Sequence, residues 1–375
     1  RTSAYGVQFE GSGRDYFRVW LANLLLTIVT LGLYTPFARW RTLAYFLNHT
    51  ALAGSSFEFV ARKLRMFLGF LLVVGLAVAS QIAQNSGNHV LSALLILSLA
   101  ALAPYLWASA MRFRLGNTRW RGLRMHFLPD WKQVYAGSWP MFVVVLAWVG
   151  LNLFVGDKPM PATRPSWPLA GGLAAMCLAS LLCAIQLDYN YKHLLLQRSF
   201  IGQEQGRWEA RYQQLAGIWL RATAIALATA VACYAAAGAL LYLVVKNVPQ
   251  VQGLFISIFG IMLLVLLMFL LLIVALLPAL AYKQAAMFKL LWNHIRIGQL
   301  AHFESTLSVP AYLRLKLKNA VLNLVTLGFY RPLARTSEYA MRFNSLTMHL
   351  SGDLDDIRGR LLEQQEHGLG DALVD

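Results

Sequence analysis

Two stretches of the chain, one near each end, carry the same residues at the same spacing. The first runs from Asn23 to Arg39 and the second from Asn319 to Arg335, and they align without a gap. Both contain Asn, Val-Thr-Leu-Gly, Tyr, Pro, Ala and Arg at equivalent positions. Coincidence of so many residue types is far more specific than shared apolar composition, so the two stretches are copies of one segment.

Each copy is a candidate binding site, because its helix is expected to break and expose backbone groups. Proline removes a backbone donor and glycine relaxes the local conformation, which predicts a break at Gly-x-Tyr-x-Pro. A pair of short apolar segments interrupted by Gly and Pro is typical of a transporter's substrate site. The candidate binding residues are Asn23, Thr27, Thr30, Gly32, Tyr34, Pro36, Asn319, Asn323, Thr326, Gly328, Tyr330 and Pro332.

A second interpretation of these segments needs no ligand. Each has only about 17 residues before its break, which is marginal for a membrane crossing. Stretches that we expect on the cytoplasmic side flank each segment at both ends. Residues 17–36 and 313–332 are therefore expected either to re-enter the membrane or to lie at its interface. At the interface, Arg39 and Arg335 would contact lipid headgroups.

Other side chains offer little further chemistry. Asp188, Arg221 and Lys283 fall at the ends of apolar stretches, where charge pairs or headgroup contacts are expected, with proton or ion coupling as the alternative. The sequence contains no His-Glu-x-x-His, Gly-x-Ser-x-Gly or phosphate-loop motif, and no Cys pair at metal-binding spacing. We expect no catalytic residue, metal or cofactor, and no enzyme activity.

The elements that position these residues are expected to be membrane helices. The 375 residues are 58% hydrophobic and 13% charged, with a net charge of +16. Soluble domains average about 45–50% apolar and about 25% charged residues, so a disordered chain and an ordinary soluble enzyme are both excluded. A basic excess in so apolar a chain favours contact with anionic lipid headgroups over nucleic acid.

Six stretches are long and apolar enough to cross a bilayer. They are residues 66–82, 90–111, 139–155, 167–187, 218–245 and 254–282. The connections on one side contain only three of the 33 Lys and Arg residues: Lys158, Arg164 and Lys246. Basic residues concentrate in cytoplasmic loops, so both termini and the larger loops are expected in the cytoplasm.

A short pattern recurs each time the chain is expected to reach the cytoplasmic side. Asn or Ser is followed by alternating residues, a Gly and an aromatic residue, usually with Glu beside it. Copies occupy residues 48–58, 117–127, 199–209 and 293–304, with a divergent copy at 344–352 and the end of another at Phe9-Glu10. Because Gly permits a tight turn, each copy predicts a small β-hairpin, and the hairpins could pair into a cytoplasmic β-layer.

The predicted fold class is therefore an all-α polytopic membrane protein. Six transmembrane helices are joined by two re-entrant or interfacial helical segments and short cytoplasmic β-hairpins. Residues 1–352 are expected to form this membrane domain, and the acid-rich residues 353–375 a solvated acidic tail.

Two functions are compatible with this architecture. One is transport, or the handling of lipids or small solutes, at the two broken segments. The alternative is a scaffold that recruits a partner protein through its cytoplasmic β-layer. Membrane lipids, with anionic headgroups at the cytoplasmic face, are the expected partners, and nucleic acid is not.

Several of these motifs together resemble the YjgN family of bacterial inner-membrane proteins. The likeness rests on Phe17 to Arg41, on Phe9 to Gly11 before it, and on Gly352 to Asp356 near the other end. It implies a polytopic protein of the inner membrane of a Gram-negative bacterium, with no established biochemical role. It supplies no catalytic residues, so function has to be argued from the site.

Overall fold

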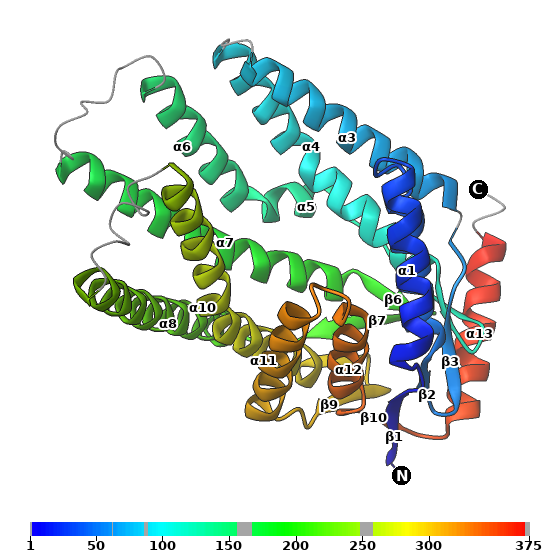
Figure 1. Ribbon diagram of the computed structural model, residues 1–375. Coiled ribbons are helices and arrows are strands. Elements are labelled where there is room, and N and C mark those ends of the chain that lie inside the picture. The colour runs from blue at the N-terminus through cyan, green and yellow to red at the C-terminus, as the bar shows by residue number, and fades with distance from the viewer. Residues whose placement is uncertain (1, 62, 86–88, 156–166, 248–257, 372–375) are drawn as a thin grey trace.

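The structure, a computed structural model, describes residues 2–61, 63–85, 89–155, 167–247 and 258–371. Within these residues, ten short strands pair edge to edge into one closed antiparallel barrel. Figure 1 shows the strands gathered in one part of the molecule and the long helices extending away from them. The strands are β1 (Thr2–Phe9), β2 (Thr50–Leu52), β3 (Ser55–Phe59), β4 (Thr118–Trp120), β5 (Leu123–Phe127), β6 (Ser199–Ile201), β7 (Glu204–Trp208), β8 (Ile295–Ile297), β9 (Ala301–Ser305) and β10 (Leu346–Ser351).

The barrel corrects the predicted fold class: an all-α protein with only short β-hairpins is wrong. A separate hairpin leaves two unpaired edges, and strands as short as β2 are not stable alone. Here each hairpin pairs with the next one, and β1 closes the circle between β10 and β2. Closure leaves no free edge, which is the physical reason why the hairpins join.

A unit of strand, helical hairpin and returning strand repeats five times in the described chain. Tight turns join successive units, and in them Gly54, Gly122, Gly202 and Gly298 have positive φ. One backbone hydrogen bond of 2.8–3.0 Å closes every unit, and its donor and acceptor pairs are Glu10–His49, Val60–Asn117, Leu128–Arg198, Glu209–His294 and Thr306–Ser345. The five helical hairpins therefore leave from one end of the barrel, and the tight turns lie at the other.

The helices of these hairpins contact one another in a closed ring. The order of contacts follows the sequence and ends with α12 against α1. The helices are α1 (Gly13–Val29), α2 (Thr35–Asn48), α3 (Lys63–Asn85), α4 (His89–Gly116), α5 (Trp131–Gly137), α6 (Trp139–Val155), α7 (Trp167–Gln197), α8 (Tyr212–Asn247), α10 (Ile258–Asn293), α11 (Val309–Val325) and α12 (Arg331–Phe343). The N- and C-terminal parts of the chain thus meet twice, in the barrel and in the ring.

Five of the described helices are long and apolar enough to cross a membrane: α3, α4, α7, α8 and α10. A sixth candidate consists of α5 and α6 together, which are bent by 48° at the break between them. These helices contain the six stretches expected to cross a bilayer, apart from residues 254–257, which are outside the described chain. Lys158 and Arg164, used to predict orientation, also lie outside the described residues.

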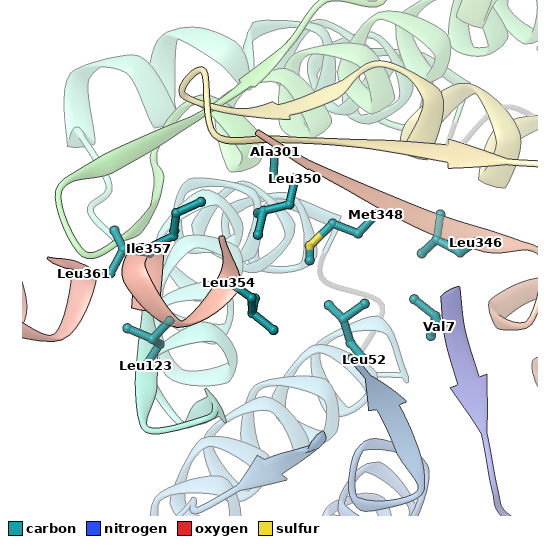
Figure 2. Close-up of a cluster of buried hydrophobic side chains, with 10 residues drawn as sticks. All are labelled: Val7, Leu52, Leu123, Ala301, Leu346, Met348, Leu350, Leu354, Ile357 and Leu361. Carbon is teal, nitrogen blue, oxygen red and sulfur yellow. The ribbon is translucent and has the colours of Figure 1, made fainter. Parts of the chain in front are cut away.

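The residues expected to form an acidic tail include a further helix, α13 (Leu354–Asp371). Leu354, Ile357 and Leu361 lie on one face of it and are 4–8% exposed. Figure 2 shows these side chains among Val7, Leu52, Leu123, Ala301, Leu346, Met348 and Leu350 of the barrel strands. An eight-stranded barrel is about as wide as its own side chains can fill, so a ten-stranded one needs additional filling. Helix α13 supplies it.

Polar contacts fix α13 at the turn end of the barrel. The Gln365 side chain accepts from the backbone N–H of Arg124 at 3.3 Å and donates to its carbonyl at 2.8 Å. Asp355 forms an ion pair with Arg121 at 3.5 Å, and Leu361 lies beside Gly202 in a neighbouring turn. The acidic face of α13 is therefore solvated, while its apolar face is part of the barrel core.

Candidate functional site

The two copied segments fold as matching helical hairpins. Helix α1 ends at Val29 and α2 begins at Thr35, while α11 ends at Val325 and α12 begins at Arg331, so each helix breaks where the Gly-x-Tyr-x-Pro pattern predicts. Gly32 and Gly328 both have a φ of +92°, which L side chains rarely adopt. The two glycines are therefore needed for the turn itself.

Most of the candidate binding residues are engaged in holding these hairpins together. The hydroxyl oxygen of Thr30 accepts from the backbone N–H of Tyr34 at 3.0 Å, and Thr326 accepts from Tyr330 at the same distance. Pro36 and Pro332 are buried in the first turns of α2 and α12, where a missing N–H costs nothing. Among the described residues, the buried side-chain oxygens of Asn23 and Asn323 have no hydrogen-bond partner.

A buried asparagine joins the two helices of each hairpin. The side-chain amides of Asn23 and Asn319 donate to the carbonyls of Ala38 and Ala334, each at 3.3 Å. Asn319 also donates to the Ser337 hydroxyl at 3.2 Å and to the Glu338 carboxylate at 3.1 Å. The second hairpin is thus more strongly tied than the first.

Replacing Asn319 by alanine is expected to cost about 1–2 kcal/mol of stability. Asn319 is 1% exposed, and the change removes the amide group that donates to Ala334, Ser337 and Glu338. Asn23→Ala, which removes a single bond of 3.3 Å, is the matched control and should cost less than half as much. Thermal unfolding of the purified protein in detergent measures both. An equal loss in the two variants would show that the contacts to Ser337 and Glu338 contribute nothing.

An open cavity of about 1320 Å³ lies against the first hairpin and α12. Its described lining comes from α1, α2, α3, α4, α12 and one residue of β3. These elements belong to three of the five repeating units, so the cavity exists only because the ring brings the two ends of the chain together.

Four of the predicted residues line this cavity: Asn23, Thr27, Arg39 and Arg335. The remaining candidates of both segments, including all those between Asn319 and Pro332, are outside its described lining. The two copies are therefore used unequally, because the first hairpin contributes both helices and the second contributes only α12.

Three further arginines were missed by sequence reasoning: Arg114 on α4, and Arg331 and Arg342 on α12. The signal for the α12 residues was the spacing of Arg331, Arg335 and Arg342, which puts them on one helical face. Arg335 is held in place, since its guanidinium donates to the Tyr16 hydroxyl at 3.2 Å and lies 5.4 Å from the Phe46 ring centroid.

Part of the cavity lining is apolar. Met66, Gly69 and Val73 line it from α3, and Leu106 and Trp107 from α4. The cavity is therefore amphipathic, with arginines contributed mainly by α12 and singly by α2 and α4, and an apolar lining contributed by α3 and part of α4.

Of the three charged residues predicted at the span ends, Asp188 lines a second, smaller cavity of about 370 Å³, whereas Arg221 and Lys283 are outside its described lining. Asp188 forms an ion pair with Lys192 and accepts a hydrogen bond from the Trp219 indole at 2.9 Å. Lys283 lies over the Trp219 ring, whereas Arg221 is exposed on α8. Trp107 lines both cavities, so the two are neighbours.

The fold and this site define a membrane protein in which five helices of a closed ring line an open amphipathic cavity beside a closed β-barrel. The chain belongs to the family described as bacterial protein of unknown function (DUF898), whose model matches residues 4–375. The resemblance to YjgN proteins is confirmed by curated relatives that carry this name.

Inner membrane protein YjgN of Escherichia coli O157:H7 is 26% identical over 158 residues, which are 42% of this chain and 40% of that protein. YjgN of Escherichia coli strain K12 is 25% identical over 158 residues, with the same shares of both chains. YjgN of Salmonella typhimurium strain LT2 is 28% identical over 146 residues, 39% of this chain and 36% of that protein. The match thus spans about two fifths of the relatives' length. No solved structure matches the chain.

Proposed function

We propose that this protein binds a membrane lipid in the cavity lined by α1, α2, α3, α4 and α12 and moves it between the bilayer and the barrel side of the helix ring. The observation that carries this proposal is the cavity itself. Sites for drug-sized molecules occupy about 300–1,000 Å³, and this cavity, of about 1320 Å³, is larger. Its arginines and its apolar lining residues match a molecule with a charged headgroup and hydrocarbon chains.

The exposed tips of the two hairpins support a lipid environment around the cavity. Leu31 and Leu327, at the turns, are 94% and 89% exposed, and Val29 and Val325 beside them are 79% and 74% exposed. Apolar clusters this exposed are stabilised only by a nonpolar surrounding. Both ends of each hairpin connect to the barrel, so we take the two hairpins as re-entrant segments that enter the bilayer from the barrel side.

In this proposal the barrel and both termini face the cytoplasm of a bacterium, and the chain crosses the inner membrane six times. The long helices α3, α4, α7, α8 and α10, with the bent pair α5 and α6, make these crossings. The protein is not an enzyme: it supplies a path and a binding site, and the anionic headgroups of the cytoplasmic leaflet are its partners.

Filling the cavity tests the proposal. Gly69 lines the cavity, and a Cβ added there meets no described atom within 4 Å. Gly69→Trp should therefore place an indole in the cavity and remove most of the lipid that copurifies with the protein in mild detergent, measured by mass spectrometry of the extract.

The matched control is Gly75→Trp, on the same helix α3. A Cβ at Gly75 also meets no described atom within 4 Å, but Gly75 is not among the cavity's described lining. It should retain its lipid. A scaffold that only recruits a protein partner makes no use of the cavity, so unchanged lipid content in Gly69→Trp would overturn the proposal.

A further inference from the structure

We infer that the bound lipid is a phospholipid whose headgroup carries net negative charge, and that arginines of α2, α4 and α12 hold its phosphate. This inference rests on the proposed function, because it assigns the headgroup chemistry of the lipid in the same cavity. Two observations support it: arginine side chains line the cavity, and carboxylate side chains are absent from its described lining.

Helix α12 presents a basic face to the cavity. Arg331, Arg335, Tyr339 and Arg342 all line it, and their spacing of four, four and three residues puts them on one side of a helix. Arg39 of α2, which is the counterpart of Arg335 in the first copy, lines the cavity as well. Both copies thus place the same arginine at one space, and α12 adds Arg331. Arg342 lines the cavity as well, with its guanidinium beside the rings of Phe288 and Tyr312.

Carboxylates are kept away from this space. The helices that line the cavity contain only two acidic residues, Asp15 and Glu338. Glu338 forms an ion pair with Lys316 of α11 at 2.6 Å, and Asp15 accepts from the Ser12 hydroxyl at the start of α1. Neither belongs to the described lining of the cavity.

The cavity's five arginines therefore lack a counter-charge. Within the part of the chain that the structure describes, none of Arg39, Arg114, Arg331, Arg335 and Arg342 is in an ion pair. Like charges gathered in one cavity repel one another, and an anion that enters relieves this repulsion. Guanidinium groups bind phosphate oxygens through paired hydrogen bonds, which makes them the side chains best suited to a phosphate headgroup.

The same arrangement selects against zwitterionic headgroups. An ethanolamine or choline group would bring a positive charge among five arginines, and no carboxylate of the described lining is present to receive it. Met66, Val73 and Leu106 line the same cavity as the arginines, so the acyl chains have an apolar surface to contact while the phosphate is held.

Binding of two lipids that differ in headgroup charge tests the inference. The full chain in nonionic detergent is titrated with phosphatidic acid or with phosphatidylethanolamine of the same acyl chains, and bound lipid is measured by native mass spectrometry. Phosphatidic acid should bind at least about tenfold more tightly, because it alone gains charged hydrogen bonds without adding a cation.

The double variant Arg39→Gln/Arg331→Gln should lose about tenfold in affinity for phosphatidic acid. Both side chains are exposed and form no hydrogen bond with described residues, so the fold should be kept, which thermal unfolding checks. The matched control, Arg112→Gln/Arg314→Gln, removes two exposed arginines outside the described lining and should bind like the unmodified protein.

Equal binding of the two lipids, together with loss of both in Gly69→Trp, would overturn the headgroup assignment and leave the proposed function standing. Lipid content that does not respond to Gly69→Trp would overturn the proposed function itself. Inorganic phosphate that binds as tightly as phosphatidic acid would overturn the assignment to a lipid, because the apolar lining would then contribute nothing.

Discussion

Ile357→Asn should destabilise the protein by about 3 kcal/mol or more. Ile357 is 4% exposed and lies on the face of α13 that packs into the barrel core. Truncating a buried aliphatic side chain costs about 2–5 kcal/mol, and an amide buried without partners adds about 1–3 kcal/mol. The loss should appear as a lower thermal unfolding temperature in detergent and as faster proteolysis near the C-terminus, because α13 detaches from the barrel.

The control for this variant is Arg360→Asn. It introduces the same side chain into the same helix, at an exposed position. Substitutions on such surfaces usually change stability by less than about 0.5 kcal/mol. Equal unfolding temperatures and equal proteolysis in the two variants would show that α13 is not part of the barrel core and that residues 354–371 behave as the solvated tail expected from their acidity.

Gly206→Ala should cost about 1–3 kcal/mol, even though alanine is the smallest possible addition. A Cβ on this residue of β7 would lie 2.5 Å from the carbonyl oxygen of Leu196 and 3.3 Å from that of Ser199. Both atoms are backbone, at the junction of α7 and β6, so relief requires the helix to shift relative to the barrel. Gly206 thus allows the close approach of one strand to the base of a helix.

Gly6→Ala is the control, since Gly6 is also a strand glycine and a Cβ there meets no described atom within 4 Å. This change should be neutral or slightly stabilising, because alanine reduces the conformational entropy of the unfolded chain. Thermal unfolding of both variants, measured in one detergent, compares their stabilities. A Gly206→Ala protein as stable as Gly6→Ala would mean that the α7–β6 junction is not closely packed against β7.

The copied segments show how much of a site local sequence can predict. The helix break, the turn glycines Gly32 and Gly328 and the proline starts of α2 and α12 follow from backbone chemistry within a few residues. For this reason the sequence predicted them correctly. Which residues face a ligand was less predictable, because Thr30 and Thr326 turned out to cap their own turns. The cavity is lined instead by arginines of α12. Their spacing is visible in the sequence, but the sequence does not show which other helices lie beside them.

The sequence alone determined that this is a membrane protein, that it belongs with the YjgN proteins, and that short hairpins follow its helices. Composition, motif order and turn glycines are properties of single stretches, so they can be read without knowing what lies beside them. Only the tertiary structure decided that the hairpins close into a barrel, since closure depends on β1 meeting β10 from the other end of the chain. The same closure leaves a lumen that α13 fills and brings α12 beside α1, which creates the basic cavity. Contacts between residues some 300 positions apart leave no local pattern, and the contribution of α12 to the candidate site depends on such contacts.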